Sequence, residues 1–556
     1  MNSNYRGASS LITLRATTLY VILTSIFGLW LAYDAAFIRL VTYAPWADYW
    51  EHTALFKEWV ENFSAPSNPH VADPSLSPRY MPLFWVLSFL GVIFQFDAVE
   101  LMSISAVLNY SLTVIGLYFF LKSYFRDPWA PLIGFITIFM FWGVSWNWSN
   151  LFHLRSFFYV AGFPSTFVFG LSLISFSLVL RLLRRDGSVF FMVALLGVLT
   201  ALMFLCHPLT AVFGIVGCGL LALTESSESI GLRLSALFAL LMGMLVAELW
   251  PYFSVWKVTL GLYGAGAEQW FSAVEPAGPL QRLQSGVWKH IFYNPGLVVT
   301  ILGPALLGLP LCIWLFIRGE HRFIFLGAAC MAVPYLLHPF VAVPLAHRFL
   351  LFVVIYFHLA ITWGGLQIIG AWNSRPKPVY ANSLFWGFIS LAIIMLIANI
   401  VLLSMEFRGY SLSPKTLEVV EKRGALPEGM SVVDLYTELT KPLPEEAIVL
   451  ATPVVGWPLP TVKAKAVSVF HENPMLLDQQ KRYIETTRFF EETQNESQRS
   501  AVIRYYKVTH LLLKGEPETQ ELGDWLNMHA EQVSTVGSYQ MYKLRASAVA
   551  ASSEPK

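Results

Sequence analysis

Long apolar runs separated by short polar connectors fill the first three quarters of the chain. Runs of about 20 apolar residues are long enough to cross a bilayer as helices. The pattern therefore predicts a polytopic α-helical membrane domain over residues 1–405, whose first run is an uncleaved helix with Arg6 and Arg15 in the cytoplasm. The twelve runs are 19–33, 81–96, 99–121, 131–146, 163–182, 189–206, 208–224, 234–255, 296–317, 323–338, 347–370 and 384–405.

The pattern changes after residue 405, where charged residues become frequent and apolar stretches become short. Alternating apolar and polar residues predict four strands, at 447–453, 465–470, 510–515 and 539–544. Helical periodicity predicts three amphipathic helices, at 479–492, 497–507 and 521–533. We therefore expect a small α/β domain over residues 406–545, followed by a disordered tail over 546–556.

Composition supports a membrane protein. Of the 556 residues, 56% are hydrophobic and only 13% are charged, against about a quarter in soluble domains. Mean hydropathy is +0.55. The net charge of +1 gives no basis for nucleic-acid binding, and none is expected. All four cysteines lie in apolar runs, which favours neither a disulfide framework nor a thiolate metal site.

Short basic connectors decide the predicted topology, because cytoplasmic loops carry an excess of Lys and Arg. If the run at 81–96 crosses the membrane, the first two connectors lie outside. If it lies in the outer interface, all five lie inside. We therefore predict eleven spans, a juxtamembrane helix at 81–96, and an extracytoplasmic location for both the first outer loop, 34–98, and the C-terminal domain. The connectors are 122–126, 181–185, 231–233, 318–322 and 374–377.

The first outer loop contains the stretch APWADYWEH, residues 44–52, in which two acids stand three residues apart. On a helix, Asp48 and Glu51 share one face. A paired carboxylate suits general-base chemistry, because one acid accepts a proton while its neighbour tunes it. The flanking Trp46 and Trp50 favour the membrane interface. The spacing fits equally an interfacial amphipathic helix with a solvated acidic face.

Further candidate binding residues lie near the predicted outer ends of the spans. An Arg there binds a phosphate bidentately or simply extends to the lipid headgroups. A His there either stabilises a turn or donates to a phosphate or sugar. Each residue alone favours the structural interpretation, whereas their gathering on one side, under the eleven-span topology, favours binding. The residues are His52, Arg79, His153, Arg155, His207, His338, His347 and Arg348.

Several motifs are absent from the sequence. It contains no GxxxxGK[ST] phosphate loop, no GxSxG elbow, no HExxH helix and no dinucleotide fingerprint. The long apolar runs are nearly free of Asp and Glu, with Glu248 as the main exception. These features argue against an ATP-driven pump, a hydrolase of the soluble type and a proton-coupled transporter.

Short motifs along nearly the whole chain resemble the GT-C superfamily of integral membrane glycosyltransferases, in particular its bacterial members. The first outer loop contributes a D-x-x-E pair followed by RYMPLFWVLSFLG (79–91). LCHPLTA (205–211) and AHRFLLF (346–352) add to the resemblance. The tail contributes VLATPVVGWPLPTVKAKAVSVFHENP (449–474) and then RYYKVTHLLLKG (504–515).

This resemblance implies an enzyme that moves a sugar from a polyprenyl-phosphate carrier to a lipid, glycan or protein acceptor, on the outer face of a bacterial inner membrane. It implies that Asp48 is the general base and Glu51 its helper, and Asp34, at the end of the first span, fits less well. No cofactor is implied, and without a second acidic cluster a divalent metal is not indicated. The basic and imidazole residues implied to bind the donor phosphate or the acceptor are Arg348 first, then Arg155 and His153, with His52, His207 and Arg79.

Two other classes of function remain open at this point. A transporter or flippase of lipid-linked sugars would move carrier lipid without depending on Asp48. A structural partner in an envelope-assembly complex would form a stable complex without turnover. The motifs name neither the sugar nor the acceptor.

Overall fold

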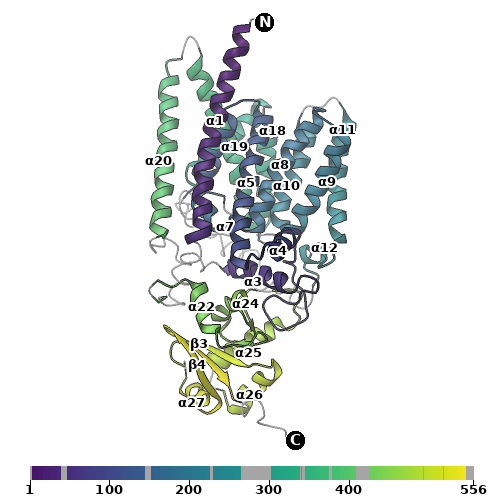
Figure 1. Cartoon of the computed structure of the whole chain (residues 1–556). Coiled ribbons are helices and arrows are strands. Elements are labelled where there is room, and N and C mark those ends of the chain that lie inside the picture. The colour runs from purple at the N-terminus through teal and green to yellow at the C-terminus, as the bar shows by residue number, and fades with distance from the viewer. Residues whose placement is uncertain are drawn as a thin grey trace. The chain divides into compact units, whose positions relative to one another are not determined.

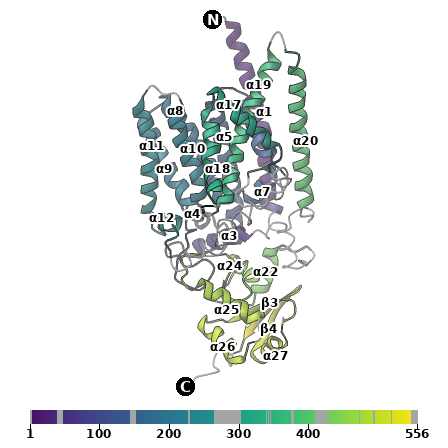
Figure 2. The ribbon, with the colours of Figure 1, turned by 180° about the vertical axis from the view of Figure 1, so that it is seen from behind.

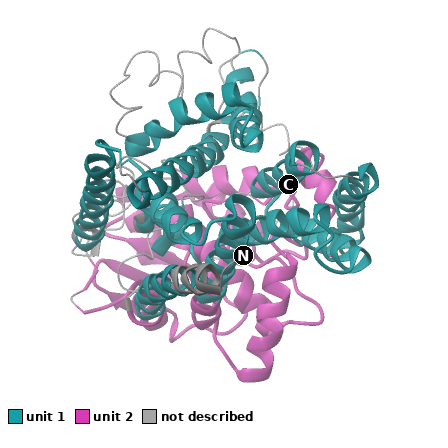
Figure 3. Ribbon diagram, turned by 90° about the horizontal axis from the view of Figure 1, so that it is seen from above, with its two compact units in different colours: residues 1–33, 105–250, 271–410 teal, residues 34–104, 251–270, 411–556 magenta. Residues whose placement is uncertain are grey.

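The chain divides into two compact units (Figure 3). The first comprises Met1–Tyr33, Ser105–Trp250 and Phe271–Tyr410, and the second comprises Asp34–Ile104, Pro251–Trp270 and Ser411–Lys556. The first outer loop therefore shares a unit with the C-terminal region. The computed structural model describes residues 3–38, 47–143, 152–225, 229–263, 302–338, 340, 343, 345–374, 378–407, 426–427, 429–471, 473–491, 494–517 and 519–545.

The first unit is helical, and its long helices run side by side (Figures 1 and 2). Neighbours in the bundle include α8 with α10, α9 with α11, and α18 with α19. Its helices are α1 (Ser3–Tyr33), most of α5 (Ala98–Phe125), α6 (Ala130–Met140), α7 (Leu154–Val160), α8 (Pro164–Leu183), α9 (Val189–Cys206), α10 (Pro208–Thr224), α11 (Ile230–Val246), α17 (Gly308–Arg318), α18 (Arg322–Leu337), α19 (Phe349–Asn373) and α20 (Ala381–Phe407). Short 3-10 turns lie at Ala247–Leu249, Gly303–Leu307 and Ala346–Arg348.

Each of the twelve apolar runs corresponds to a helix, which confirms the predicted polytopic helical architecture. Within the described part of the chain, seven helices are long and apolar enough to cross a membrane: Thr13–Phe37, Ala98–Phe125, Pro164–Leu183, Val189–Cys206, Ile230–Leu249, Phe349–Asn373 and Ala381–Ser404. Five apolar helices are shorter: Pro82–Phe94, Ala130–Met140, Pro208–Thr224, Gly303–Arg318 and Arg322–Leu337. The total of eleven spans therefore stays a prediction.

Small residues allow the helices of the bundle to approach closely. A Cβ atom on Gly243 of α11 would lie 2.4 Å from the carbonyl oxygen of Gly197 on α9. A Cβ atom on Gly327 of α18 would lie 2.1 Å from the ring of Tyr356 on α19. Glycine at such positions is typical of helix contacts in membranes, where van der Waals packing drives association.

The second unit contains a five-stranded sheet with helices around it. The strand order is β2-β1-β3-β5-β4, in which β2, β1 and β3 are parallel and β5 pairs antiparallel with both β3 and β4. The strands are β1 (Ile448–Leu450), β2 (Lys465–Ala466), β3 (His510–Lys514), β4 (Ala530–Val536) and β5 (Tyr539–Leu544). The helices are α3 (Ala47–Glu61), α4 (Pro82–Phe94), α12 (Val255–Thr259), α22 (Val432–Thr440), α23 (Pro453–Gly456), α24 (Leu459–Val462), α25 (Gln479–Glu491), α26 (Glu496–Tyr505) and α27 (Gln520–His529), with a π-helical turn at Asp34–Ile38.

Burial explains why β3 lies in the middle of the sheet. The strand HLLLK is buried along nearly its whole length, as expected of a strand covered on both faces. Leu511 and Leu513 pack into a core that includes Phe489 of α25 and Trp525 of α27. The helices predicted at 479–492 and 497–507 correspond to α25 and α26. All four predicted strands are present, three in shorter form and the one at 539–544 with the predicted bounds.

One predicted helix in this region is partly wrong. The helix expected over 521–533 ends at His529, and residues 530–536 form β4 instead. The sequence AEQVSTV alternates and contains β-branched residues, and its pairing with β5 across a turn at Gly537 (φ +58°) outweighs helical periodicity. The predicted tail over 546–556 lies outside the described residues.

Candidate functional site

The helix α3 carries the acid pair and is almost entirely buried. Trp50 and Trp59 are at most 1% exposed. The hydroxyl of Thr53 bonds to the carbonyl oxygen of Tyr49 one turn earlier, at 2.9 Å, and lies 2.8 Å from the hydroxyl of Thr461 in α24. The helix is thus held against the C-terminal part of its unit.

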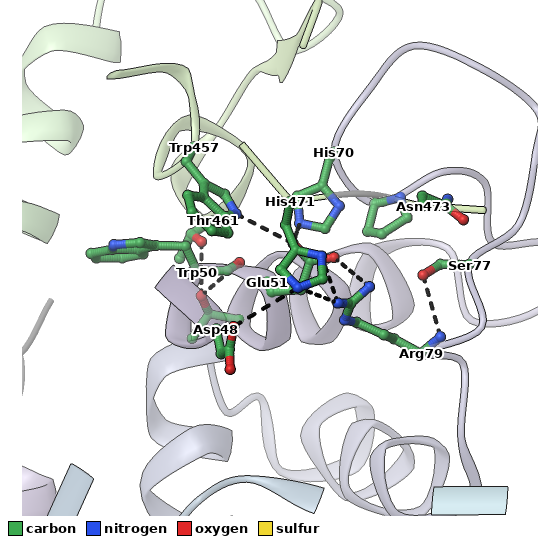
Figure 4. A network of polar contacts seen from close by, with 12 residues as sticks. Asp48, Trp50, Glu51, His70, Ser77, Arg79, Trp457, Thr461, His471 and Asn473 are labelled. Carbon is green, nitrogen blue, oxygen red and sulfur yellow. Dashed lines mark hydrogen bonds and ion pairs between the residues drawn. The ribbon is translucent and has the colours of Figure 1, made fainter. Parts of the chain in front are cut away.

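Glu51 lies at the centre of a polar network (Figure 4). Its Oε1 is 2.9 Å from Nη1 of Arg79, and its Oε2 accepts a hydrogen bond of 3.3 Å from the indole N–H of Trp457. Nε2 of His70 also lies 3.3 Å from Oε2. Burial opposes ionisation of this carboxyl, but electrostatic interactions with Arg79, His70, His471 and His52 together outweigh it and lower the pKa of Glu51 to about 2. Glu51 is therefore a buried, ionised carboxylate that holds Arg79 and Trp457 in place.

Asp48 has a different environment from Glu51, although both belong to the same face of α3. Its side chain is 36% exposed, against 2% for that of Glu51. Its Oδ1 lies 3.9 Å from Nε2 of His471 (Figure 4). A carboxylate that takes a proton from a substrate must be reachable by that substrate. Of the two acids, Asp48 meets this requirement.

Arg79 connects the two acids through His471. While Nη1 of Arg79 contacts Glu51, Nη2 lies 2.7 and 2.9 Å from the two ring nitrogens of His471. The imidazole in turn faces Asp48 (Figure 4). His471 was not predicted as a site residue, because 392 residues separate it from Arg79 and no local spacing relates them. The only signal was its place in the tail motif that ends in HENP.

A second set of contacts fixes the loop that carries His70 and Arg79. Nζ of Lys465 donates to Oε2 of Glu58 at 2.6 Å and to the carbonyl oxygen of Asn68 at 2.7 Å. The backbone N–H of Ala466 in β2 donates to the carbonyl oxygen of His70 at 2.8 Å. The loop therefore extends the edge of the sheet, and the fold of the C-terminal region positions the network around Glu51.

His52 and Asp34 are also in the second unit and are buried. Burial lowers the pKa of His52 to about 3, and its ring lies 5.0 Å from that of Phe84. His52 is therefore neutral, and its predicted substrate contact stays a prediction. Asp34 is 0% exposed in the turn that follows α1. Among the described residues, no three His, Cys, Asp or Glu side chains gather in a group that could hold a metal ion.

The predicted histidines of the first unit have structural contacts at helix ends. Nδ1 of His153 accepts from the backbone N–H of Ser156 and caps α7, and Nδ1 of His207 accepts from that of Thr210 and caps α10. His338 accepts from the backbone N–H of Val343. These contacts are what the structural interpretation expects, and the binding roles of His153 and His207 stay predictions.

The predicted phosphate-binding arginines are also in the first unit. Arg348 ends the short turn Ala346–Arg348 and directly precedes α19, and its side chain is partly buried. Arg155 lies in α7, but its side chain is outside the described part of the chain, as is that of His347. The phosphate role of the arginines therefore stays a prediction.

Solved structures resemble this chain over almost its whole length. The Archaeoglobus fulgidus oligosaccharyltransferase in its apo form matches 95% of this chain and 74% of its own, with 16% identity and a TM-score of 0.54. The arabinofuranosyltransferase AftD from Mycobacteria matches 95% of this chain with 12% identity and a TM-score of 0.55, and this chain spans 40% of its length. Neither a family model nor a curated protein sequence matches the chain. The likeness is one of fold.

Proposed function

Because the chain has the fold of the GT-C membrane glycosyltransferases, we propose that it transfers a sugar from a polyprenyl-phosphate carrier to a glycan, lipid or protein acceptor. The reaction takes place on the extracytoplasmic face of the membrane. The observation that carries the proposal is the partly exposed carboxylate of Asp48, held on a buried helix beside His471. Sugar transfer needs a base of this kind at a place that an acceptor can reach.

In the proposed reaction, Asp48 takes the proton of an acceptor hydroxyl as that oxygen attacks the anomeric carbon of the donor. The bond from the anomeric carbon to the phosphate oxygen breaks, and its electron pair leaves with the polyprenyl phosphate. The displacement inverts the anomeric centre and involves no metal ion. Positive side chains stabilise the charge on the leaving phosphate. For this role we propose Arg348 first, followed by Arg155 and His153.

Glu51 assists Asp48 indirectly in this proposal. Its ionised carboxylate fixes Arg79, and Arg79 contacts the ring of His471, which faces Asp48. Because Glu51 is buried and its oxygens contact Arg79, Trp457 and His70, it holds the geometry of the site and takes no proton from the acceptor. Asp48 and Glu51 are therefore expected to respond differently to removal of their charge.

The first prediction concerns this difference. We expect Asp48→Asn to reduce transfer by about 10²- to 10⁴-fold, the usual contribution of a general base, while thermal unfolding is unchanged. Glu51→Gln should reduce transfer and also lower the unfolding temperature, because it leaves the partly buried Arg79 without its counter-charge. The measurement is transfer from undecaprenyl-phosphate-linked mannose, glucose and arabinose by the protein in nanodiscs.

Near-normal transfer by Asp48→Asn would contradict the assignment of the base. Movement of the carrier lipid across vesicles, with no transfer and no effect of Asp48→Asn, would identify a transporter instead. A stable complex with other envelope proteins that neither transfers nor transports would identify a structural component.

A further inference from the structure

The short segment that carries His471 is fixed by hydrogen bonds to its neighbours in the second unit. Nε2 of Gln479, in the first turn of α25, donates to the carbonyl oxygen of His471 at 2.8 Å. Nδ2 of Asn473 donates to the carbonyl oxygen of Leu76 at 2.9 Å. Leu76 belongs to the loop that carries Arg79. The segment is therefore bonded both to α25 and to this loop, and these bonds fix where the ring of His471 lies.

The ring of His471 has a cation and a carboxylate as neighbours (Figure 4). Nη2 of Arg79 lies 2.7 Å from Nδ1 and 2.9 Å from Nε2 of the ring. Nε2 also lies 3.9 Å from Oδ1 of Asp48. The side chain of His471 is 25% exposed and that of Asp48 is 36% exposed, so solvent reaches both. The imidazole thus contacts the guanidinium and faces the proposed base.

The hydrogen-bonding capacities of these groups decide which ring nitrogen carries a hydrogen. Arginine only donates, an ionised carboxylate only accepts, and a neutral imidazole has one donor and one acceptor nitrogen. If Nδ1 carried the hydrogen, a donor would face the guanidinium at 2.7 Å and the lone pair of Nε2 would face the carboxylate. If both nitrogens carried one, no acceptor would remain for Arg79. The neutral ring with its hydrogen on Nε2 satisfies both neighbours.

A hydrogen on Nε2 has two consequences for Asp48. A donor beside a carboxylate favours the ionised form, which is the form that takes a proton. It also favours one orientation of the carboxylate over others. The distance of 3.9 Å is longer than that of a hydrogen bond, as contacts between catalytic groups often are before substrate binds.

We propose that His471 is the positioning residue of the base: its Nε2–H orients the carboxylate of Asp48 and keeps it ionised, while its Nδ1 accepts from Arg79. The C-terminal region thereby completes a site whose base lies on α3. This inference rests on the proposed function, because it identifies what orients the proposed base. The other charged or titratable groups around the pair are Glu51, His52, His70 and Arg79, and the variants below leave all four in place.

Carboxyl labelling of the whole chain in nanodiscs tests this inference without sugar transfer. A water-soluble carbodiimide with glycine ethyl ester reacts with a protonated carboxyl, and mass spectrometry gives the labelling of Asp48 at each pH. We expect His471→Leu to move the midpoint of this curve upward by about one pH unit, because the ionised form loses its donor. His471→Ala, which removes the same donor, should behave in the same way. Glu61, which is 50% exposed on the same helix, is the internal standard.

Rescue by a conservative variant distinguishes positioning from packing. The amide of His471→Gln can accept from Arg79 and donate to Asp48, so this variant should keep the labelling midpoint of the unaltered protein. In the transfer assay, His471→Leu should lower kcat by about 10- to 100-fold, the effect of a misplaced catalytic group. Its pH profile of kcat/KM should begin to fall about one unit higher, and His471→Gln should restore most of the activity and the original profile.

A double variant shows whether His471 acts through Asp48. If it does, His471→Leu should reduce transfer little further once Asp48→Asn is present, because the effects of residues that act as a unit do not add. The matched control is His529→Leu, which removes a histidine that lies 3.2 Å from Glu496 in the same unit. This variant should leave transfer, its pH profile and the labelling of Asp48 unchanged.

The inference is overturned if neither His471→Leu nor His471→Ala moves the labelling midpoint of Asp48, or if His471→Gln is as impaired as they are. It is also overturned if His471→Leu reduces transfer by the same factor with and without Asp48→Asn. Its failure differs from failure of the proposed function. If transfer depends on Asp48 but not on His471, the assignment of the base stands and His471 does not position it. If no sugar is transferred, or Asp48→Asn transfers normally, the assignment of the base falls, whereas a raised midpoint still shows that His471 keeps this carboxylate ionised.

Discussion

At the scale of single residues, the fold of the second unit gives different environments to two acids that would be equivalent by their spacing alone. Asp48 and Glu51 occupy the same face of α3, as their three-residue spacing predicts. The difference between them comes from distant segments: Trp457 and Arg79 contact Glu51, while His471 lies near the more exposed Asp48. The type and spacing of the acids were predictable from the sequence, whereas their unequal burial depends on tertiary packing.

The pH dependence of stability belongs to this scale. Burial lowers the pKa of His52 to about 3 and of His70 to about 4, from 6.5. Below pH 6.5 the unfolded histidines bind protons that the folded ones do not, so stability is complete above pH 6.5 and falls as the pH decreases. Each histidine should contribute about 1.4 kcal/mol per pH unit. For Glu51, whose pKa is lowered from 4.5 to about 2, the corresponding loss occurs only below pH 4.5.

We therefore predict that the unfolding temperature falls between pH 6.5 and 4.5. Because burial also lowers the pKa of His510 to about 4 and lowers that of His321, His70→Gln should reduce this slope by at most about a third. The charged and titratable groups around His70 are Glu51, Arg79, Lys465 and His471. Intrinsic tryptophan fluorescence during heating, at several pH values, measures the slope. An unchanged slope in His70→Gln would show that His70 titrates normally in the folded protein.

At the scale of elements, the periodicity of apolar residues predicted those helices and strands that depend on local sequence. Each apolar run became a helix, and strands formed wherever short alternating stretches were found in the tail. The exception is β4, where helical periodicity continued past His529 although the chain pairs with β5 from Ala530 onward. The backbone hydrogen bond from Ala466 to His70, which extends the edge of the sheet, could not be predicted either, because the pairing of distant segments has no local pattern in the sequence.

The contact of α3 with β2 depends on a buried ion pair. Glu58 of α3 is 3% exposed, and its Oε2 lies 2.6 Å from Nζ of Lys465. Burial opposes ionisation of Glu58, but Lys465 and the bonds from Ser67 lower its pKa. Removing the lysine alone would leave a buried charge without its cation, which is far more destabilising than removing both partners.

We predict that Lys465→Ala destabilises the protein by about 3 kcal/mol, the lower end of the usual range, because Ser67 still donates to Glu58. The double variant Glu58→Gln with Lys465→Met should recover most of this loss. The control is Lys57→Ala, which breaks a more exposed pair with Glu61 and should cost at most about 1 kcal/mol. Equal effects of Lys465→Ala and Lys57→Ala on thermal unfolding would show that the contact of α3 with β2 does not depend on the ion pair between Glu58 and Lys465.

At the scale of the whole molecule, the composition of the second unit bears on the number of spans. Residues 58–71 pack against residues 465–466, so the first outer loop and the C-terminal region lie on the same side of the membrane. An even number of crossings must therefore separate them. Eleven of the apolar runs lie between these segments. Because eleven is odd and the number of crossings is even, an odd number of these runs, at least one, does not cross the membrane.

The helix α4 is the best candidate for the run that does not cross. Its 13 residues correspond to about 20 Å, less than the roughly 30 Å of a hydrocarbon core. It belongs to the second unit, where Phe84 packs on Phe56 of α3, while Phe89 and Ile93 are exposed. A helix with one buried and one exposed apolar face fits the interface, as the basic connectors predict.

Labelling of single cysteines tests this topology in intact cells, after the four native cysteines are replaced by alanine. We expect an impermeant maleimide to label Ser64→Cys and Ser497→Cys from outside, and Lys122→Cys only after permeabilisation. If α4 and all later runs crossed, Lys122→Cys would be labelled from outside and Ser497→Cys would not. If α6, with only 11 residues, were the run that stays on one side, both Lys122→Cys and Ser497→Cys would be labelled from outside. The three positions together therefore show whether the run that does not cross lies before or after Lys122.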